Sequence, residues 1–159
     1  MTPTASSRAR GVGSGNWIGY HDAQEGREPR EVLTEVLRAF DAEGRVGSAV
    51  DLGCSDGTDS LALERGWDVL SIDAQADAIR RLRARHTDDV AARSTTVVSP
   101  MHAVDLPPTD LVFASFSLPF CPRRRSQTCG FASGRRSARV DASRASCSAT
   151  ATRGRPIPR

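Results

Sequence analysis

Lysine is absent from the 159-residue chain, so all 22 basic side chains are arginine. This bias indicates a GC-rich coding sequence and carries little information about mechanism. Long apolar runs are also missing: none approaches the roughly 20 residues that a helix needs to span a bilayer. The N-terminus lacks the apolar segment of a signal peptide. We therefore expect a cytoplasmic protein that does not contact a membrane.

Cysteine is scarce, and its spacing argues against a metal site. The four cysteines are Cys54, Cys121, Cys129 and Cys147. No two of them are separated by the two residues typical of zinc-binding pairs. We expect reduced thiols and no bound metal, with Cys54 acting as a small apolar residue.

Acidic and basic residues are distributed unevenly along the chain. Residues 1–122 hold 12 arginines against 18 aspartates and glutamates, whereas residues 123–159 hold 10 arginines and one aspartate. Residues 123–159 also lack leucine and show no apolar periodicity, which predicts a segment of low order. We interpret this tail as the product of truncation or of a frame shift near Pro122. The alternative is a genuine basic tail for nucleic acid, which is less favoured.

The composition divides the chain into three parts. Residues 1–15 are rich in threonine, serine, arginine and glycine, which predicts a disordered N-terminus. The glycines at positions 11, 13 and 15 follow no predicted strand, so they do not indicate a phosphate-binding loop. Residues 16–122 form the one predicted domain, and residues 123–159 form the tail.

The most informative segment combines a strand, a glycine turn, a helix and a second strand. Residues 48–52 are an apolar run typical of a buried parallel strand. Residues 53–57 then form a turn with two glycines, which let a ligand approach the backbone closely. A second predicted strand, residues 67–72, ends at Asp73. A carboxylate in this position can accept hydrogen bonds from the ribose hydroxyls of a nucleotide.

Two nucleotide-binding patterns were compared with this turn. The dinucleotide pattern requires glycines at the positions of Gly53, Ser55 and Thr58, and only one matches. The second pattern requires an acidic residue two positions before the first glycine and further glycines two and four positions after it. Asp51, Gly53 and Gly57 fit that pattern, and Ser55 is the one departure. An ordinary strand-to-helix turn without a ligand is the remaining alternative.

In these residues the chain resembles the class I S-adenosylmethionine-dependent methyltransferases, over roughly residues 17–122. The resemblance implies an α/β, Rossmann-like methyltransferase core with an incomplete parallel sheet in the strand order 3-2-1-4. It further implies that residues 53–57 pass beneath the methionine part of the cofactor. Asp51 would position its amino group, usually through water, and Asp73 would hold the ribose.

The resemblance assigns two further loops to the site. The loop after a predicted strand at residues 95–99 would flank the adenine. The loop after residues 110–115 would face the transferred methyl group, which makes Ser115 and Phe116 candidates for the active-site wall. No catalytic side chain is predicted. The predicted cofactor contacts are Asp51, Gly53, Cys54, Ser55, Gly57, Asp73, Ala74, Met101, His102 and Ser115.

Helical periodicity predicts helices over residues 28–40 and 74–86. Thr58 or Asp59 can cap the helix after the glycine turn. The resemblance implies that the helix at residues 28–40 covers the pocket. Tyr20 or Arg30 could then touch the cofactor, the arginine through the methionine carboxylate. Packing for the tyrosine and solvation for the arginine are the favoured alternatives. The arginines at positions 80, 81, 83 and 85 are expected to form a solvated face.

The function implied by the resemblance is methyl transfer from S-adenosylmethionine to a small molecule, with no activity if the chain is truncated. Two alternatives stay open: a non-catalytic nucleotide-binding remnant and a fragment of an NAD-binding oxidoreductase. We expect a monomer that aggregates if truncated, because the fourth strand would form a bare sheet edge. The sequence does not indicate the methyl acceptor.

Overall fold

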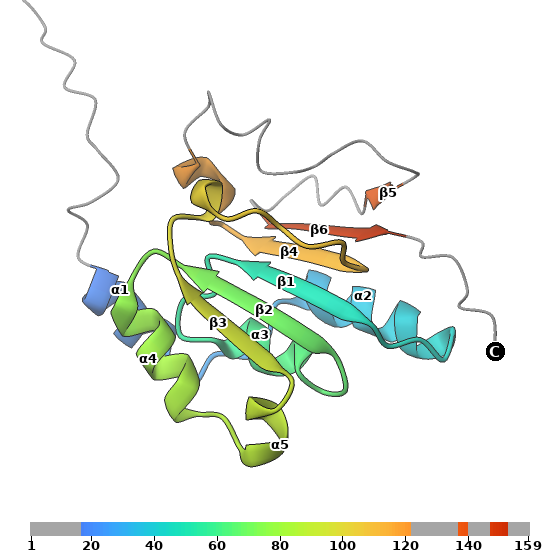
Figure 1. Ribbon diagram of the computed structural model, residues 1–159, viewed down its shortest axis with the longest axis horizontal. Helices are drawn as coiled ribbons and strands as arrows, with labels where there is room; N and C mark the ends of the chain where they lie inside the picture. Colours follow the sequence, from blue (N-terminus) through green and yellow to red (C-terminus); the bar gives the residue numbers. More distant parts are fainter. Residues whose placement is uncertain (1–16, 122–136, 140–146, 153–159) are drawn as a thin grey trace, which may run out of the picture.

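Four parallel strands form the centre of the computed structural model, which describes residues 17–121, 137–139 and 147–152 (Figure 1). They lie in the order β3-β2-β1-β4, as predicted. Each strand matches its predicted range to within one residue. The strands are β1 (Ser48–Leu52), β2 (Asp68–Asp73), β3 (Ser94–Val98) and β4 (Leu111–Ser115). The predicted disorder of residues 1–15, and most of the predicted tail, lie outside the described residues.

The prediction of a bare edge at the fourth strand is wrong. The strand β6 (Cys147–Thr152) pairs with β4 in antiparallel orientation, with Leu111 opposite Ala151 and Ser115 opposite Cys147. The short strand β5 (Ser137–Arg139) then pairs with β6. Strand pairing uses backbone groups, which every residue except proline supplies in full. A search for large apolar residues therefore missed a segment of small and β-branched ones.

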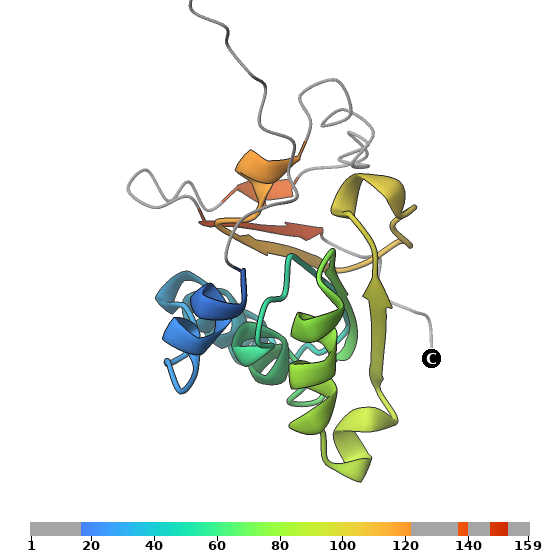
Figure 2. The same ribbon diagram turned by 90° about the vertical axis from the view of Figure 1, so that its left-hand side faces the viewer.

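The longer helices lie together on one side of the sheet (Figure 2). The helix α4 contacts β2 and β3, α3 contacts β1 and β2, and α2 contacts β6. The α-helices are α1 (Trp17–Gln24), α2 (Glu31–Ala42), α3 (Thr58–Leu63), α4 (Ala76–Ala84) and α5 (Asp88–Ala91), and two 3-10 turns are η1 (Met101–Ala103) and η2 (Leu118–Phe120). The structure thus adds α1, α5 and both 3-10 turns to the elements predicted from the sequence.

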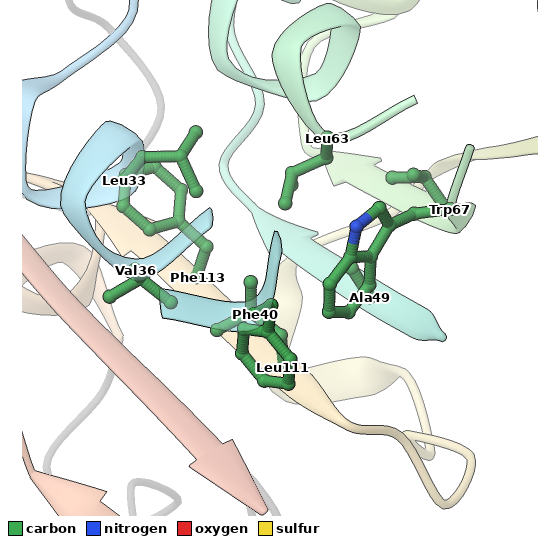
Figure 3. Close-up of a cluster of buried hydrophobic side chains, with 9 residues drawn as sticks. Leu33, Val36, Phe40, Ala49, Leu63, Trp67, Leu111 and Phe113 are labelled. Carbon is green, nitrogen blue, oxygen red and sulfur yellow. The ribbon is translucent and has the colours of Figure 1, made fainter. Parts of the chain in front are cut away.

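The apolar stripe of α2 packs on the sheet. Leu33, Val36 and Phe40 are buried against residues of β1, β2, β4 and α3 (Figure 3). The ring of Phe40 meets the indole of Trp67 edge to face, with 4.8 Å between ring centroids. Such aromatic pairs add about 0.5–1.5 kcal/mol to the gain from area burial. This packing fixes the start of α2, and therefore Arg30, relative to the sheet.

The opposite face of the sheet is covered differently. Val50, Leu52, Ile72 and Ala114 point to this side, since side chains alternate along a strand. Within the described part of the chain, no α-helix contributes to this cluster. Its covering residues come from the loops after β3 and β4 and include Met101, Val104, Leu106 and Leu118. These loops therefore combine packing with a position at the carboxyl ends of the strands.

The predicted cap of the third helix is wrong. Gly57 occupies the N-cap position of α3, with φ +85°, and Thr58 is the first helical residue. Thr58 donates its hydroxyl hydrogen bond to Asp56 over 2.7 Å. The Asp59 carboxylate instead binds Arg27, which lies 32 positions earlier in the chain. The local sequence pattern predicts that Asp59 caps the helix, but Asp59 forms a long-range ion pair with Arg27 instead.

Arg80, Arg83 and Arg85 are exposed, as expected of a solvated face, and Arg81 is half-buried. Three of the four also bind other elements of the fold, which was not predicted. Arg81 binds Asp22 of α1 over 2.7 Å, and Arg83 binds Thr96 of β3 over 2.7 Å. Just after α4, Arg85 binds the backbone and the carboxylate of Asp56. These side chains are therefore engaged within the fold.

Gly57 permits a close contact between the glycine turn and α4. A Cβ atom added at Gly57 would lie 2.9 Å from Cβ of Leu82 and closer still to its Cδ1. Gly44 has a similar backbone conformation, φ +62°, but faces open space. An alanine at Gly44 would therefore suffer backbone strain alone, whereas an alanine at Gly57 would suffer both backbone strain and steric overlap.

We predict that Gly57→Ala lowers the free energy of unfolding by about 2–5 kcal/mol, the sum of left-handed strain and overpacking. Gly44→Ala, the matched control, lowers it by about 1–2 kcal/mol through strain alone. Denaturant unfolding measures both values. Equal losses in the two variants would show that the contact with Leu82 does not require glycine.

Candidate functional site

A cavity of about 720 Å³ opens at the carboxyl ends of the parallel strands. Its walls come from the loops that follow β1, β2, β3 and β4, and from α1. The chain order reverses between β1 and β4, and ligands of open α/β sheets bind at such a reversal. The volume falls within the range of about 300–1,000 Å³ for small-molecule pockets. This cavity is therefore the candidate site.

The glycine turn forms the floor of the cavity beside β1. Gly53 has φ +75°, and a Cβ atom there would lie 2.5 Å from Cβ of Ser117. Gly53 and Cys54 donate their backbone N–H groups to the carbonyl of Ile72, over 2.7 and 3.1 Å. A side chain at position 53 would thus collide with the loop after β4, and it would also obstruct a ligand in the cavity.

Asp73 fastens this turn to the end of the second strand. One carboxylate oxygen accepts the backbone N–H of Ser55 over 3.0 Å, and the other accepts that of Gln75 over 2.8 Å. Asp73 and Ser55 both line the cavity. Each carboxylate oxygen still has a lone pair for a further donor.

Ser55 has two features that mark a ligand-facing position. Its φ of +54° lies in the left-handed region, which residues other than glycine seldom occupy. Its hydroxyl oxygen is buried and has no hydrogen-bond partner among the described residues. Buried polar groups are normally paired, so an unpaired one on a cavity wall is suited to a polar ligand.

Two predicted contact residues lie outside the described lining of the cavity. Gly57 packs against Leu82, as described above. Asp51 is 1% exposed and accepts a hydrogen bond from the Ser60 hydroxyl over 2.7 Å. Burial, followed by the nearby charge of Asp59, raises the pKa of Asp51 to about 7. Asp51 can therefore act on a ligand only through its charge or through an intervening group.

The other predicted contact residues all border the cavity. Burial raises the pKa of the Cys54 thiol well above its ordinary value, so Cys54 stays protonated and is not a nucleophile. The lining includes Gly53, Cys54, Ser55, Asp73, Ala74, Met101, His102 and Ser115.

Sequence reasoning missed an ion pair in the cavity wall. Arg27 binds Asp59 through the two terminal nitrogens of its guanidinium group, over 2.5 and 3.1 Å. The backbone N–H of Arg30 donates to the same carboxylate over 2.9 Å. The pair joins the segment before α2 to the start of α3, and no local pattern connects residues so far apart in sequence.

Tyr20 and Arg30 also line the cavity, as the resemblance suggested for them. They come from α1 and from the N-cap of α2. The helix α1 is held on α4 by the pair of Arg81 with Asp22, and His21 approaches Asp77 with 3.8 Å between Nδ1 and Oδ2. The helix α1, which was not predicted from the sequence, therefore forms one wall of the cavity.

Four aromatic side chains also border the cavity: Trp17, Tyr20, Phe116 and Phe120. Trp17 meets Phe120 edge to face at 5.2 Å and Tyr20 at 5.9 Å. Neither α1 nor the 3-10 turn η2 was predicted from the sequence, so the convergence of their rings was not predictable either. We call these four residues the aromatic wall.

Two kinds of feature are absent from the described residues. No group of three or more histidine, cysteine, aspartate or glutamate side chains is placed to hold a metal ion. Among the helices described, none is long and apolar enough to cross a membrane.

Comparisons with known proteins were made by sequence and by structure. No protein-family model matches the chain, and no curated protein matches it. Among solved structures, monomeric WbdD matches with a TM-score of 0.52 and 18% identity, over 87% of this chain and 45% of that one. The methyltransferase domain of bacterial CtHen1 matches with a TM-score of 0.51 and 16% identity, over 62% of this chain and 55% of that one.

The glycopeptide N-methyltransferase MtfA with bound S-adenosyl-L-methionine gives a TM-score of 0.41 at 22% identity, over 52% of this chain and 37% of that one. The chain spans about half the length of WbdD and of the CtHen1 domain. The two higher scores and the strand order show that the chain has the α/β, Rossmann-like fold of class I methyltransferases.

Proposed function

We propose that the cavity binds S-adenosylmethionine and that the chain transfers its methyl group to a small molecule. One observation carries this proposal: the Asp73 carboxylate and the Gly53–Ser55 turn face the same cavity at the carboxyl ends of the strands. A carboxylate in this position suits the two hydroxyls of a ribose. The methyltransferase fold of the neighbours supports the choice of cofactor.

The residues present fit such a cofactor. The unpaired Ser55 hydroxyl is available to a polar group, and Asp73 keeps a lone pair on each oxygen. Gly53 leaves its backbone accessible where it borders the cavity. Ser55, which stands where related enzymes usually have glycine, adopts the left-handed conformation that this position requires.

The order of the strands gives the order of the contacts. Neighbouring strands lie about 4.8 Å apart, so the ends of β3, β2, β1 and β4 form a row about 15 Å long. Along this row, Met101 and His102 would flank the adenine, Asp73 would hold the ribose, and Ser55 would contact the methionine part. Ser115, at the end of β4, would lie beside the transferred methyl group.

The chemistry requires position more than reactive side chains. S-adenosylmethionine supplies an electrophilic methyl group attached to a sulfonium. The turn, Asp73 and the wall from α1 would hold the two reactants in line and exclude water. Such positioning can contribute about 7–11 kcal/mol to lowering a barrier. The protonated Cys54 takes no part as a nucleophile.

We predict that Asp73→Ala weakens binding of S-adenosylhomocysteine at least about 100-fold, because two hydrogen bonds to a charged acceptor are lost. Asp68→Ala, at the exposed opposite end of β2, is the control and leaves affinity unchanged. Isothermal titration calorimetry measures both, with NAD titrated in parallel. Unchanged affinity in Asp73→Ala would contradict the ribose contact, and tighter binding of NAD would favour the oxidoreductase alternative.

Asp51 gives the proposed site a pH dependence. With its pKa raised to about 7, the buried group holds a proton below that pH and is charged above it. A bound cation favours the charged form, so affinity for S-adenosylmethionine rises as the pH increases through about 7. In the unliganded chain we expect the reverse trend from this residue: the contribution of Asp51 to the free energy of unfolding falls from about pH 4 to 7, because the folded state retains the proton more tightly.

Calorimetric titrations and denaturant unfolding at several pH values measure these two slopes. In Asp51→Asn the contribution of this residue to both slopes disappears. Slopes of unchanged size in that variant would show that another group is responsible.

A further inference from the structure

We infer that the methyl acceptor is a planar aromatic compound with an anionic oxygen, such as a phenolate or an aromatic carboxylate. The inference extends the proposed function to the substrate class. It comes from the aromatic wall and from the guanidinium of Arg30, which borders the same cavity.

The rings of the aromatic wall are accessible although they lie in a cavity. Tyr20 is 40% exposed, Phe116 36% and Phe120 46%. They belong to segments about one hundred residues apart that meet through the contact of Trp17 with Phe120. Exposed rings that enclose a space favour a flat apolar ligand, since aromatic pairs are stabilised by offset and edge-to-face contacts.

Phe116 is held in an unfavourable backbone conformation. Its φ of +57° is rare for a bulky residue, and such a conformation is energetically unfavourable. The residue directly follows Ser115, which the proposed function puts beside the transferred methyl group. Strain of this kind gathers at functional sites, where it fixes the direction of a side chain.

Arg30 provides a positive charge next to this ring. Its guanidinium carbon lies 4.8 Å from the centroid of Phe116. Its side chain donates hydrogen bonds to the neutral oxygens of Ser115 and Gln24, over 3.2 Å each. Among the described residues, no carboxylate forms an ion pair with the Arg30 side chain, whereas Arg27 is paired with Asp59. Arg30 is therefore the cavity cation available to an anionic ligand.

This arrangement selects by charge. An oxyanion beside a guanidinium gains a charge-assisted hydrogen bond, whereas an ammonium group meets a like charge. An acceptor that arrives as an oxyanion also needs no base to remove a proton. The row of strand ends places Ser115 about 10 Å from Asp73, so the acceptor and the ribose occupy different parts of the cavity.

The test uses four small probes with the full chain, first without and then with saturating S-adenosylhomocysteine. Benzoate, benzyl alcohol and benzylamine have similar rings with charges of −1, 0 and +1, and cyclohexanecarboxylate has the charge without the flat ring. NMR titration measures their affinities. We expect benzoate to bind at least about 10-fold more tightly than benzylamine and several-fold more tightly than cyclohexanecarboxylate.

Variants assign each preference to its residue. Arg30→Gln abolishes the preference for charge, and Phe116→Leu abolishes the preference for the flat ring. Arg38→Gln, an exposed arginine on the same helix, is the control and preserves both. A check of S-adenosylhomocysteine affinity in each variant confirms that the cofactor part of the cavity is intact.

Three results would overturn the inference. The first is equal affinity for the charged and uncharged rings. The second is a charge preference that disappears when S-adenosylhomocysteine is added, which would show that Arg30 serves the carboxylate of the cofactor. The third is a charge preference that persists in Arg30→Gln. Failure of S-adenosylhomocysteine to bind at all would instead contradict the proposed function.

Discussion

The hydrogen bonds from the backbone of Ser55 and Gln75 to the Asp73 carboxylate organise the candidate site. They hold the end of β2 against the turn after β1, and so fix the floor of the cavity. The same carboxylate is the group best placed to receive a ribose. A structural role and a binding role are therefore combined in one side chain, and the proposed function depends on that combination.

Buried charges support this arrangement from beneath. Asp51 lies just before the turn and belongs to a chain of hydrogen bonds with Ser60 and Ser71. The ion pair of Arg27 with Asp59 joins the segment before α2 to α3 in the cavity wall. Burying ionisable groups costs free energy unless they are paired or protonated. Burial of Asp51 disfavours its charged form, and its pKa is raised for that reason. Such a framework is expected beneath a site that binds a cation.

Local patterns predicted the parallel strands and the placement of Asp73, because a buried strand and a glycine turn are specified by neighbouring residues. They failed where distant segments meet. Asp59 was assigned to a helix cap because its partner Arg27 is remote. Phe116 was predicted as a candidate for the active-site wall, but its left-handed backbone and its contact with Arg30 were not predicted. The strand at residues 147–152 was missed because backbone pairing leaves little trace in the side chains. The interpretation of residues 123–159 as out of frame stays a prediction.

A crystal structure of the chain with S-adenosylhomocysteine tests the central claim most directly. The account predicts both ribose hydroxyls within about 3 Å of the Asp73 carboxylate, with the Ser55 hydroxyl bonded to the ligand or to a water that it holds. A ligand bound elsewhere, or a ribose turned away from Asp73 within the cavity, would contradict it.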